Sequence, residues 1–158
     1  MKLRLVIIGY GAIAIDLIER LRNKYNTDLN LAVLLRVNSS ARSRVPKGID
    51  CLSNMQEILE FKPDLVVEAA GHQAVLEYAQ DCLLSGLSFV AASVGAMSDE
   101  SFYQQLCQSA IKGRSKLIFP SGAIGALDYL HAIQGLPDSE VVYESRKPPS
   151  AWTKELEQ

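Results

Sequence analysis

The sequence predicts an α/β fold in which a parallel β-sheet is covered by helices, and two observations favour this prediction. Short apolar runs alternate with longer segments whose apolar residues recur at helical spacing. The chain has 158 residues, of which 48% are hydrophobic and 22% charged, as is typical of a globular protein. A chain of this size can bury a substantial core as a single domain.

The apolar runs give the expected strands, at residues 3–8, 29–35, 65–70, 88–92, 116–119 and 141–145. The helical patterns give the expected helices, at residues 13–23, 54–61, 74–85, 99–111 and 123–134. In the first of these helices, Ile13 shares its predicted apolar face with Leu17, Ile18 and Leu21. Residues 36–48 are rich in Ser, Asn, Pro and Gly, so a loop is expected there.

Residues 9–14 (GYGAIA) fit the pattern G-x-G-x-x-G/A between the first strand and the first helix. Gly9 would permit the tight turn, and Gly11 would let a pyrophosphate approach the backbone. Ala14 is small enough for the helix to pack closely on the strand. The motif predicts a Rossmann-type doubly wound sheet that binds a nicotinamide dinucleotide, NAD or NADP, with the pyrophosphate at the start of the helix. The alternative is a tight turn without a ligand.

The end of the second strand bears on the choice between the two cofactors. A carboxylate there binds the ribose 2′-hydroxyl of NAD, whereas Arg accommodates the 2′-phosphate of NADP. Residues 29–48 contain no Asp or Glu, but they include Arg36 and further basic residues at positions 42, 44 and 47. We expect NADP to be accepted at least as well as NAD, with Arg36 as the phosphate ligand. A solvated basic loop without preference is the alternative.

Small residues and glycines also follow the later strands, at residues 69–72 (AAGH), 93–96 (SVGA) and 120–126 (PSGAIGA). Ligands of open parallel sheets bind outside the carboxyl ends of the strands. We therefore expect Ala70, Gly71 and Ser93 to leave room for the cofactor and to offer it exposed N–H groups. His72 could contact cofactor or substrate, or could be an ordinary solvent-facing residue, and the two interpretations are equally supported. Glu68, inside an apolar run, is interpreted as a structural carboxylate.

Several classes of partner and site are not expected. The net charge of −2 gives no reason to expect nucleic acid or an anionic membrane as a partner. Three irregularly spaced cysteines predict neither a disulfide framework nor a metal site. Residues 1–14 could imitate a signal peptide, but their apolar run is short and is broken by glycines, so a cytoplasmic protein is expected.

Taken together, five stretches resemble the L-aspartate dehydrogenase family. They occur in the family's order across nearly the whole chain, and the last two are the most specific. The matching stretches are residues 9–13 (GYGAI), 67–72 (VEAAGH), 93–96 (SVGA), 120–128 (PSGAIGALD) and 146–152 (RKPPSAW).

The resemblance implies NAD(P)-dependent oxidative deamination of L-aspartate, through iminoaspartate, to oxaloacetate and ammonia. The reverse reductive amination is also implied, as is a supply of iminoaspartate to NAD biosynthesis. By the same resemblance, Gly9, Gly11, Ala12 and Ile13 hold the pyrophosphate, and Ala123 lies at the nicotinamide side of the cofactor.

The resemblance also predicts the domain organisation. Residues 1–145 would form the NAD(P)-binding domain, and residues 146–158 a connector towards a second domain, which this chain is expected to lack. In the family that domain supplies the catalytic histidine, whose motif position neither His72 nor His131 occupies. The chain is then either half of a dehydrogenase or an inactive NAD(P)-binding module, such as a truncated paralogue. Apolar surface left near the sheet edge and around Trp152 predicts a homodimer.

Overall fold

The structure is a computed structural model that describes residues 2–25 and 28–120, together with the single positions 133, 135, 136, 140, 142 and 144. The chain divides into two compact units, Met1–Gly122 and Ala123–Gln158, and the sheet belongs to the first. Several expectations fall outside the described residues, wholly or almost so. These are the helix at 123–134, the strand at 141–145, the connector at 146–158, Ala123 and His131. The predicted domain boundary therefore stays a prediction.

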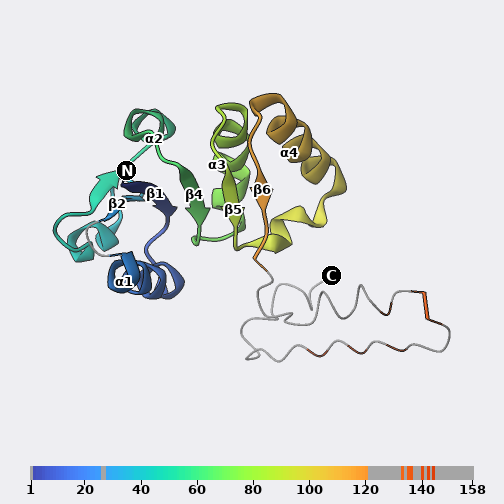
Figure 1. Ribbon diagram of the computed structural model, residues 1–158, viewed down its shortest axis with the longest axis horizontal. Coiled ribbons are helices and arrows are strands. Elements are labelled where there is room, and N and C mark those ends of the chain that lie inside the picture. Colours follow the sequence, from blue (N-terminus) through green and yellow to red (C-terminus); the bar gives the residue numbers. More distant parts are fainter. Residues whose placement is uncertain are drawn as a thin grey trace. The chain divides into compact units, whose positions relative to one another are not determined.

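The first unit contains a parallel sheet of six strands in the order β3-β2-β1-β4-β5-β6, which confirms the predicted doubly wound Rossmann-type fold (Figure 1). The strands are β1 (Leu3–Ile8), β2 (Leu29–Leu34), β3 (Asp50–Leu52), β4 (Leu65–Glu68), β5 (Phe89–Ala91) and β6 (Leu117–Ile118). The direction of the strand order reverses between β1 and β4. In such sheets the crevice at this switch point is where ligands bind.

The helices cover both faces of the sheet (Figure 1). They are α1 (Ala12–Tyr25), α2 (Met55–Phe61), α3 (His72–Leu84) and α4 (Glu100–Gly113). Alternate residues of β1 belong to different cores: Leu5 and Ile7 pack with α1, whereas Val6 and Ile8 pack with α2 and α3. The strands are apolar along most of their length because both faces are covered.

Side-chain caps explain where two of the helices begin. The Asn54 side chain accepts a hydrogen bond from the Glu57 N–H at the start of α2, and Glu57 in turn accepts one from the Ser53 N–H. The Asp99 carboxylate accepts hydrogen bonds from the N–H groups of Ser101 and Phe102 at the start of α4. These caps satisfy N–H groups that the first turn of a helix leaves unpaired.

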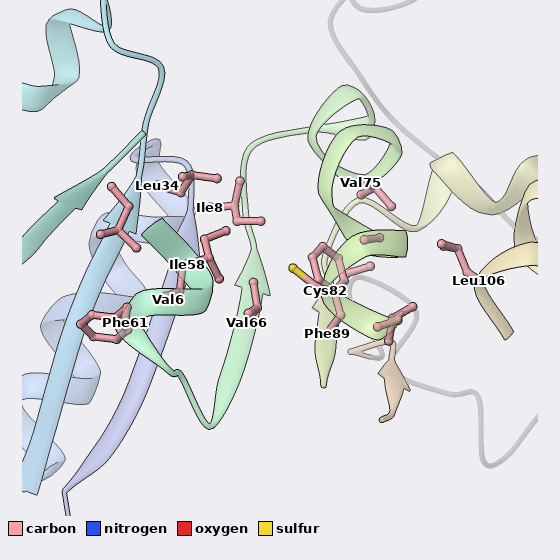
Figure 2. Close-up of a cluster of buried hydrophobic side chains, with 14 of the residues drawn as sticks. Val6, Ile8, Leu34, Ile58, Phe61, Val66, Val75, Cys82, Phe89 and Leu106 are labelled. Carbon is pink, nitrogen blue, oxygen red and sulfur yellow. The ribbon is translucent and has the colours of Figure 1, made fainter. Parts of the chain in front are cut away.

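The larger core lies between the sheet and helices α2, α3 and α4, and Figure 2 shows its side chains. Ile58, Phe89 and Leu106 are among the largest fully buried side chains there. Cys82 is also fully buried, and burial, with a smaller contribution from Asp81, raises the pKa of its thiol to about 12. The thiol therefore packs as a small neutral apolar group. None of the helices in the described ranges is long and apolar enough to cross a bilayer.

Three features differ from the expectations. The stretch predicted as loop contains the 3-10 helix η2 (Ser40–Arg44), and the strand β3, which was not expected, begins at Asp50. A second 3-10 helix, η3 (Val94–Ser98), follows β5. The placement of Ile13 on the apolar face of α1 is wrong: its side chain is 66% exposed, because Ala14 and Ile18 are the residues that α1 buries against the sheet.

Candidate functional site

The turn between β1 and α1 depends on Gly9 for its shape. Gly9 has a φ of 99°, and its N–H donates a hydrogen bond to the Leu34 carbonyl at 3.1 Å. A Cβ at this position would lie 2.7 Å from the Ala70 Cβ and 3.0 Å from the Ala69 carbonyl oxygen. Both the backbone conformation and the close approach of β4 therefore require glycine here.

The second glycine of the motif serves a different purpose. Gly11 has no positive φ, and a Cβ added to it would meet no atom within 4 Å. Helix α1 begins at the next residue, Ala12, and has no acidic residue in its first turn. N–H groups at a helix start lack intrahelical partners and attract anions. The open space at Gly11 is thus suited to a pyrophosphate group.

A cavity of about 620 Å³ opens beside this turn, at the carboxyl ends of β1 and β2 and along the start of α3. It is lined by Ile8, Gly9, Leu34, Leu35, Arg36, Asn38, Ser39, Ser40, Ala70, Gly71, Gln73, Ala74, Glu77 and Tyr78. Its position at the switch point of the sheet and its volume suit the adenosine part of a dinucleotide.

The basic residues of the loop after β2 are not equivalent. Arg36 is exposed and lines the cavity together with Ser39 and Ser40. In contrast, the Arg42 guanidinium donates hydrogen bonds to the carbonyls of Leu35 at 2.9 Å and Cys51 at 3.1 Å. Arg42 therefore ties β2 to β3, and among the basic residues of this loop Arg36 alone lines the cavity.

Helix α3 brings to the cavity four residues that the sequence analysis did not single out as site residues, namely Gln73, Ala74, Glu77 and Tyr78. Burial, and then the neighbouring Glu77 carboxylate, raise the pKa of Tyr78 to about 12, while Arg36 acts in the opposite direction. Tyr78 is thus a neutral hydroxyl over the physiological pH range. Gln73 and Glu77 are spaced i, i+4, as are Ala74 and Tyr78, so helical periodicity could have placed them on one face.

Glu68, the last residue of β4, is fully buried and joins the turns after β4 and β5. Its Oε1 accepts hydrogen bonds from the N–H groups of Ala70 and Gly71, both at 2.7 Å, and from the Ser93 hydroxyl at 2.9 Å. Its Oε2 accepts one from the Ser93 N–H at 3.0 Å. The interpretation of Glu68 as a structural carboxylate agrees with these contacts.

These contacts overturn one expectation. The N–H groups of Ala70, Gly71 and Ser93 were expected to be exposed for the cofactor, but they donate to Glu68 instead. A buried carboxylate needs such donors to replace its lost hydration, which explains why the turns point their N–H groups inward. Ala70 and Gly71 still line the cavity, whereas Ser93 is not among its lining residues.

His72 begins α3 and is exposed. Its imidazole lies against Gly95 of η3, where a Cβ would come within 2.6 Å of Nε2. His72 is not among the cavity-lining residues. No group of three or more His, Cys, Asp or Glu side chains within the described residues could hold a metal ion.

The family defined by the NAD-binding domain of homoserine dehydrogenase matches residues 9–120, which is well over half of the chain. The matched segment starts at the first fingerprint glycine and ends just after β6. The chain belongs to this family. It is therefore a nicotinamide-dinucleotide-binding domain of the dehydrogenase type, as the fingerprint predicted.

Individual relatives confirm the predicted resemblance to L-aspartate dehydrogenase. The chain is 41% identical to L-aspartate dehydrogenase 2 of Bordetella pertussis over 156 residues, which cover 99% of this chain and 58% of the relative. It is 32% identical to L-aspartate dehydrogenase of Pseudomonas aeruginosa over 155 residues, covering 95% and 57%, respectively. The chain thus spans somewhat more than half the length of the curated relatives it matches.

Solved structures agree. The crystal structure of aspartate dehydrogenase from Thermotoga maritima superimposes with a TM-score of 0.66 at 27% identity, over 85% of this chain and 52% of that one. A dihydrodipicolinate reductase from Paenisporosarcina gives a TM-score of 0.68 at 21% identity, over 96% of this chain and 63% of that one. The second likeness concerns the fold alone.

Proposed function

We propose that this chain is the cofactor-binding part of an NAD(P)-dependent L-aspartate dehydrogenase. The reaction is the oxidative deamination of L-aspartate through iminoaspartate to oxaloacetate and ammonia, and its reverse. The observation that carries the proposal is the 41% identity to an L-aspartate dehydrogenase over nearly the whole chain. The open backbone at Gly11 and the adjoining cavity support it, because they suit the cofactor that such an enzyme needs.

In this proposal the chain's own residues bind and orient the cofactor. Gly11, Ala12 and Ile13 present backbone N–H groups at the start of α1 to the pyrophosphate. The cavity between β2 and α3 takes the adenosine, with Ala70 and Gly71 on its wall. When bound, NAD(P)+ supplies the acceptor for the hydride removed from the substrate.

The family resemblance implies that Ala123 lies at the nicotinamide side of the cofactor, and we assign Ser93 and His72 to the same side. Ser93 and His72 follow β5 and β4 at the same edge of the sheet. Ala123 lies outside the described residues, and its role is proposed from the family resemblance alone.

Arg36 is proposed to favour NADP. Its guanidinium can bind a ribose 2′-phosphate bidentately, and Ser39 and Ser40 line the same part of the cavity. Glu77 opposes this preference, because a carboxylate in the cavity repels a phosphate and can accept a hydrogen bond from a ribose hydroxyl. The proposal is therefore that NADP binds at least as well as NAD, rather than exclusively.

Reductive amination by the purified chain tests the proposed activity. Oxidation of NADPH and NADH would be followed with oxaloacetate and ammonia, and cofactor binding would be titrated by fluorescence. Turnover with oxaloacetate would support the dehydrogenase. Failure to bind either cofactor would contradict the proposal.

A second candidate is an NAD(P)-binding module that catalyses nothing by itself. One observation favours it: His72 is the only histidine among the described residues, and its imidazole lies against Gly95 of η3. A dehydrogenase of this kind needs a positioned acid or base close to the reacting carbon. Cofactor binding without turnover, at any oxaloacetate concentration, would support this module.

Self-association is also proposed, as a homodimer. Among the described residues the short strand β6 forms one edge of the sheet, and the exposed apolar residues Ile118, Phe119 and Val94 lie at or near this edge. Exposed apolar surface beside an unpaired strand edge promotes association. Sedimentation of the chain at micromolar concentration checks it, and a monomer would refute it.

A further inference from the structure

Glu68 stands apart from the other carboxylates of the described residues because it is fully buried, and its hydrogen bonds come from neutral donors. The donors come from the turn after β4 and from the turn after β5. In the second turn, Ser93 lies 25 residues after Glu68 in the sequence. Hydrogen bonds to a charged acceptor are short and strong, and those of Ala70 and Gly71 measure 2.7 Å. One side chain thus fixes the spacing of two turns.

The linkage reaches the fingerprint turn as well. The Ala70 Cβ lies 2.7 Å from where a Gly9 Cβ would be, so the two turns leave no room for a side chain between them. Moving Ala70 would therefore disturb Gly9, or open a gap beside it. Through Ala70, Glu68 links the turns after β1, β4 and β5, the three turns next to the switch point.

The direction of the cofactor gives this linkage a function. If adenosine occupies the cavity beside β2 and the pyrophosphate lies at Gly11, the remaining half of the dinucleotide must extend across β4 towards β5. The turn at Ser93 then borders the nicotinamide half. We propose that Glu68 is a positioning residue that holds the Ser93 turn at the spacing required by the nicotinamide half of the cofactor, an inference that rests on the proposed cofactor binding.

Glu68→Gln tests this proposal selectively. The glutamine oxygen can keep the three donors now at Oε1, but its NH₂ group would face the Ser93 N–H, donor against donor. The adenosine side of the site should therefore keep its structure, whereas the Ser93 turn should lose its hydrogen bond from the Ser93 N–H to Glu68. We expect the Kd of NADPH to rise about tenfold, which corresponds to one lost hydrogen bond, while the Kd of 2′,5′-ADP changes less than about twofold.

Amide hydrogen exchange supplies a readout without cofactor. In Glu68→Gln the Ser93 amide should lose protection while those of Ala70 and Gly71 keep theirs. Ser88→Ala is the matched control, because the Ser88 hydroxyl accepts a hydrogen bond from the Lys116 N–H at the opposite end of β5. This variant also removes a hydrogen bond next to β5, and it should leave the Kd of NADPH unchanged.

If Glu68→Gln does not fold, Ser93→Ala replaces it, since it removes the hydroxyl donor alone. Where both variants fold, the double variant should weaken NADPH binding less than the sum of the single effects, because both act on one linkage. Equal loss of 2′,5′-ADP and NADPH affinity, no loss of either, or additive effects would overturn the proposed role. A wild-type chain that binds 2′,5′-ADP but neither NADPH nor NADH would instead contradict the proposed function itself.

Discussion

The turn after β1 and the turns after β4 and β5 look alike in sequence but are built in opposite ways. At Gly11 the backbone faces open space at the start of α1. At Ala70, Gly71 and Ser93 the N–H groups are already bound by the buried Glu68 carboxylate. The first region can receive an external anion, whereas the second already contains an internal one. Small residues after a strand therefore do not by themselves predict available N–H donors.

The two fingerprint glycines repeat this contrast within one motif. Gly9 is required by the folded chain itself, through its φ of 99° and its contact with Ala70. Gly11 has neither constraint, so its lack of a side chain matters for what approaches from outside. Substitutions at the two positions should consequently affect different measurements.

The largest effect is expected for Gly9→Ala. We predict that it lowers the free energy of unfolding by about 3 kcal/mol, the sum of backbone strain and overpacking against Ala70. Urea denaturation measures this loss. Gly71→Ala is the matched control: Gly71 has a φ of 135° but no atom within 4 Å of its added Cβ, so only the strain of about 1 kcal/mol applies. Equal losses in the two variants would show that the contact with Ala70 contributes nothing.

Gly11→Ala should show the reverse pattern. Its unfolding free energy should stay within about 0.5 kcal/mol of the wild type, because the added methyl group meets no atom. The Kd of NADPH should nevertheless rise about thirtyfold, or about 2 kcal/mol, because the methyl group keeps the pyrophosphate from the backbone. Unchanged affinity in fluorescence titration would remove Gly11 from the proposed site.

Arg36→Ala sharpens the assignment of the adenosine side. The Kd of NADPH should rise about tenfold through loss of the charged contact, while that of NADH changes less than about twofold. Arg44→Ala serves as the control, because Arg44 belongs to the same loop but does not line the cavity. Full retention of NADPH affinity by Arg36→Ala would support the alternative interpretation, in which the basic residues of this loop are solvated and favour neither cofactor.

The smallest effect is expected for Gly95→Ala, in the turn after β5. The added Cβ would meet the His72 imidazole at 2.6 Å, but the exposed ring can rotate away, so the unfolding free energy should fall by less than about 1 kcal/mol. Thermal unfolding checks this value. In a His72→Ala background the same substitution should cost nothing, and an undiminished cost there would mean that the strain lies elsewhere.

Much of the fold could be predicted because apolar runs and helical periodicity report burial directly. The strands β1, β2, β4 and β5 and the helices α1 to α4 agree with the expectations to within a few residues. The strand β3 could not be found in this way: it has three residues, its first residue is an exposed Asp50, and it follows a polar stretch. It forms because β2 offers an edge and Arg42 ties the two strands together.

The site was less accessible to sequence reasoning. Position in the chain predicted Gly9, Gly11 and Arg36 as site residues, because each lies within three residues of the end of a strand. Helical spacing could place Glu77 and Tyr78 on one face of α3, but whether this face borders the cavity depends on how α3 packs on the sheet, which no local pattern records. The acceptor of the N–H groups of Ala70 and Ser93 could likewise not be predicted, because local composition does not show that both groups donate to Glu68.

The central place of β1 has a consequence for how the chain folds. β1 precedes both of its partners in the sequence: it pairs with β2, which begins at Leu29, and with β4, which begins only at Leu65. Its two edges are therefore satisfied at very different times during synthesis. Parallel pairing of this kind depends on contacts between distant parts of the chain, which slows folding and leaves apolar edges exposed in the meantime. The strand that carries the fingerprint turn thus keeps one apolar edge unpaired until β4 has been synthesised, so the nascent chain depends on the completion of the sheet.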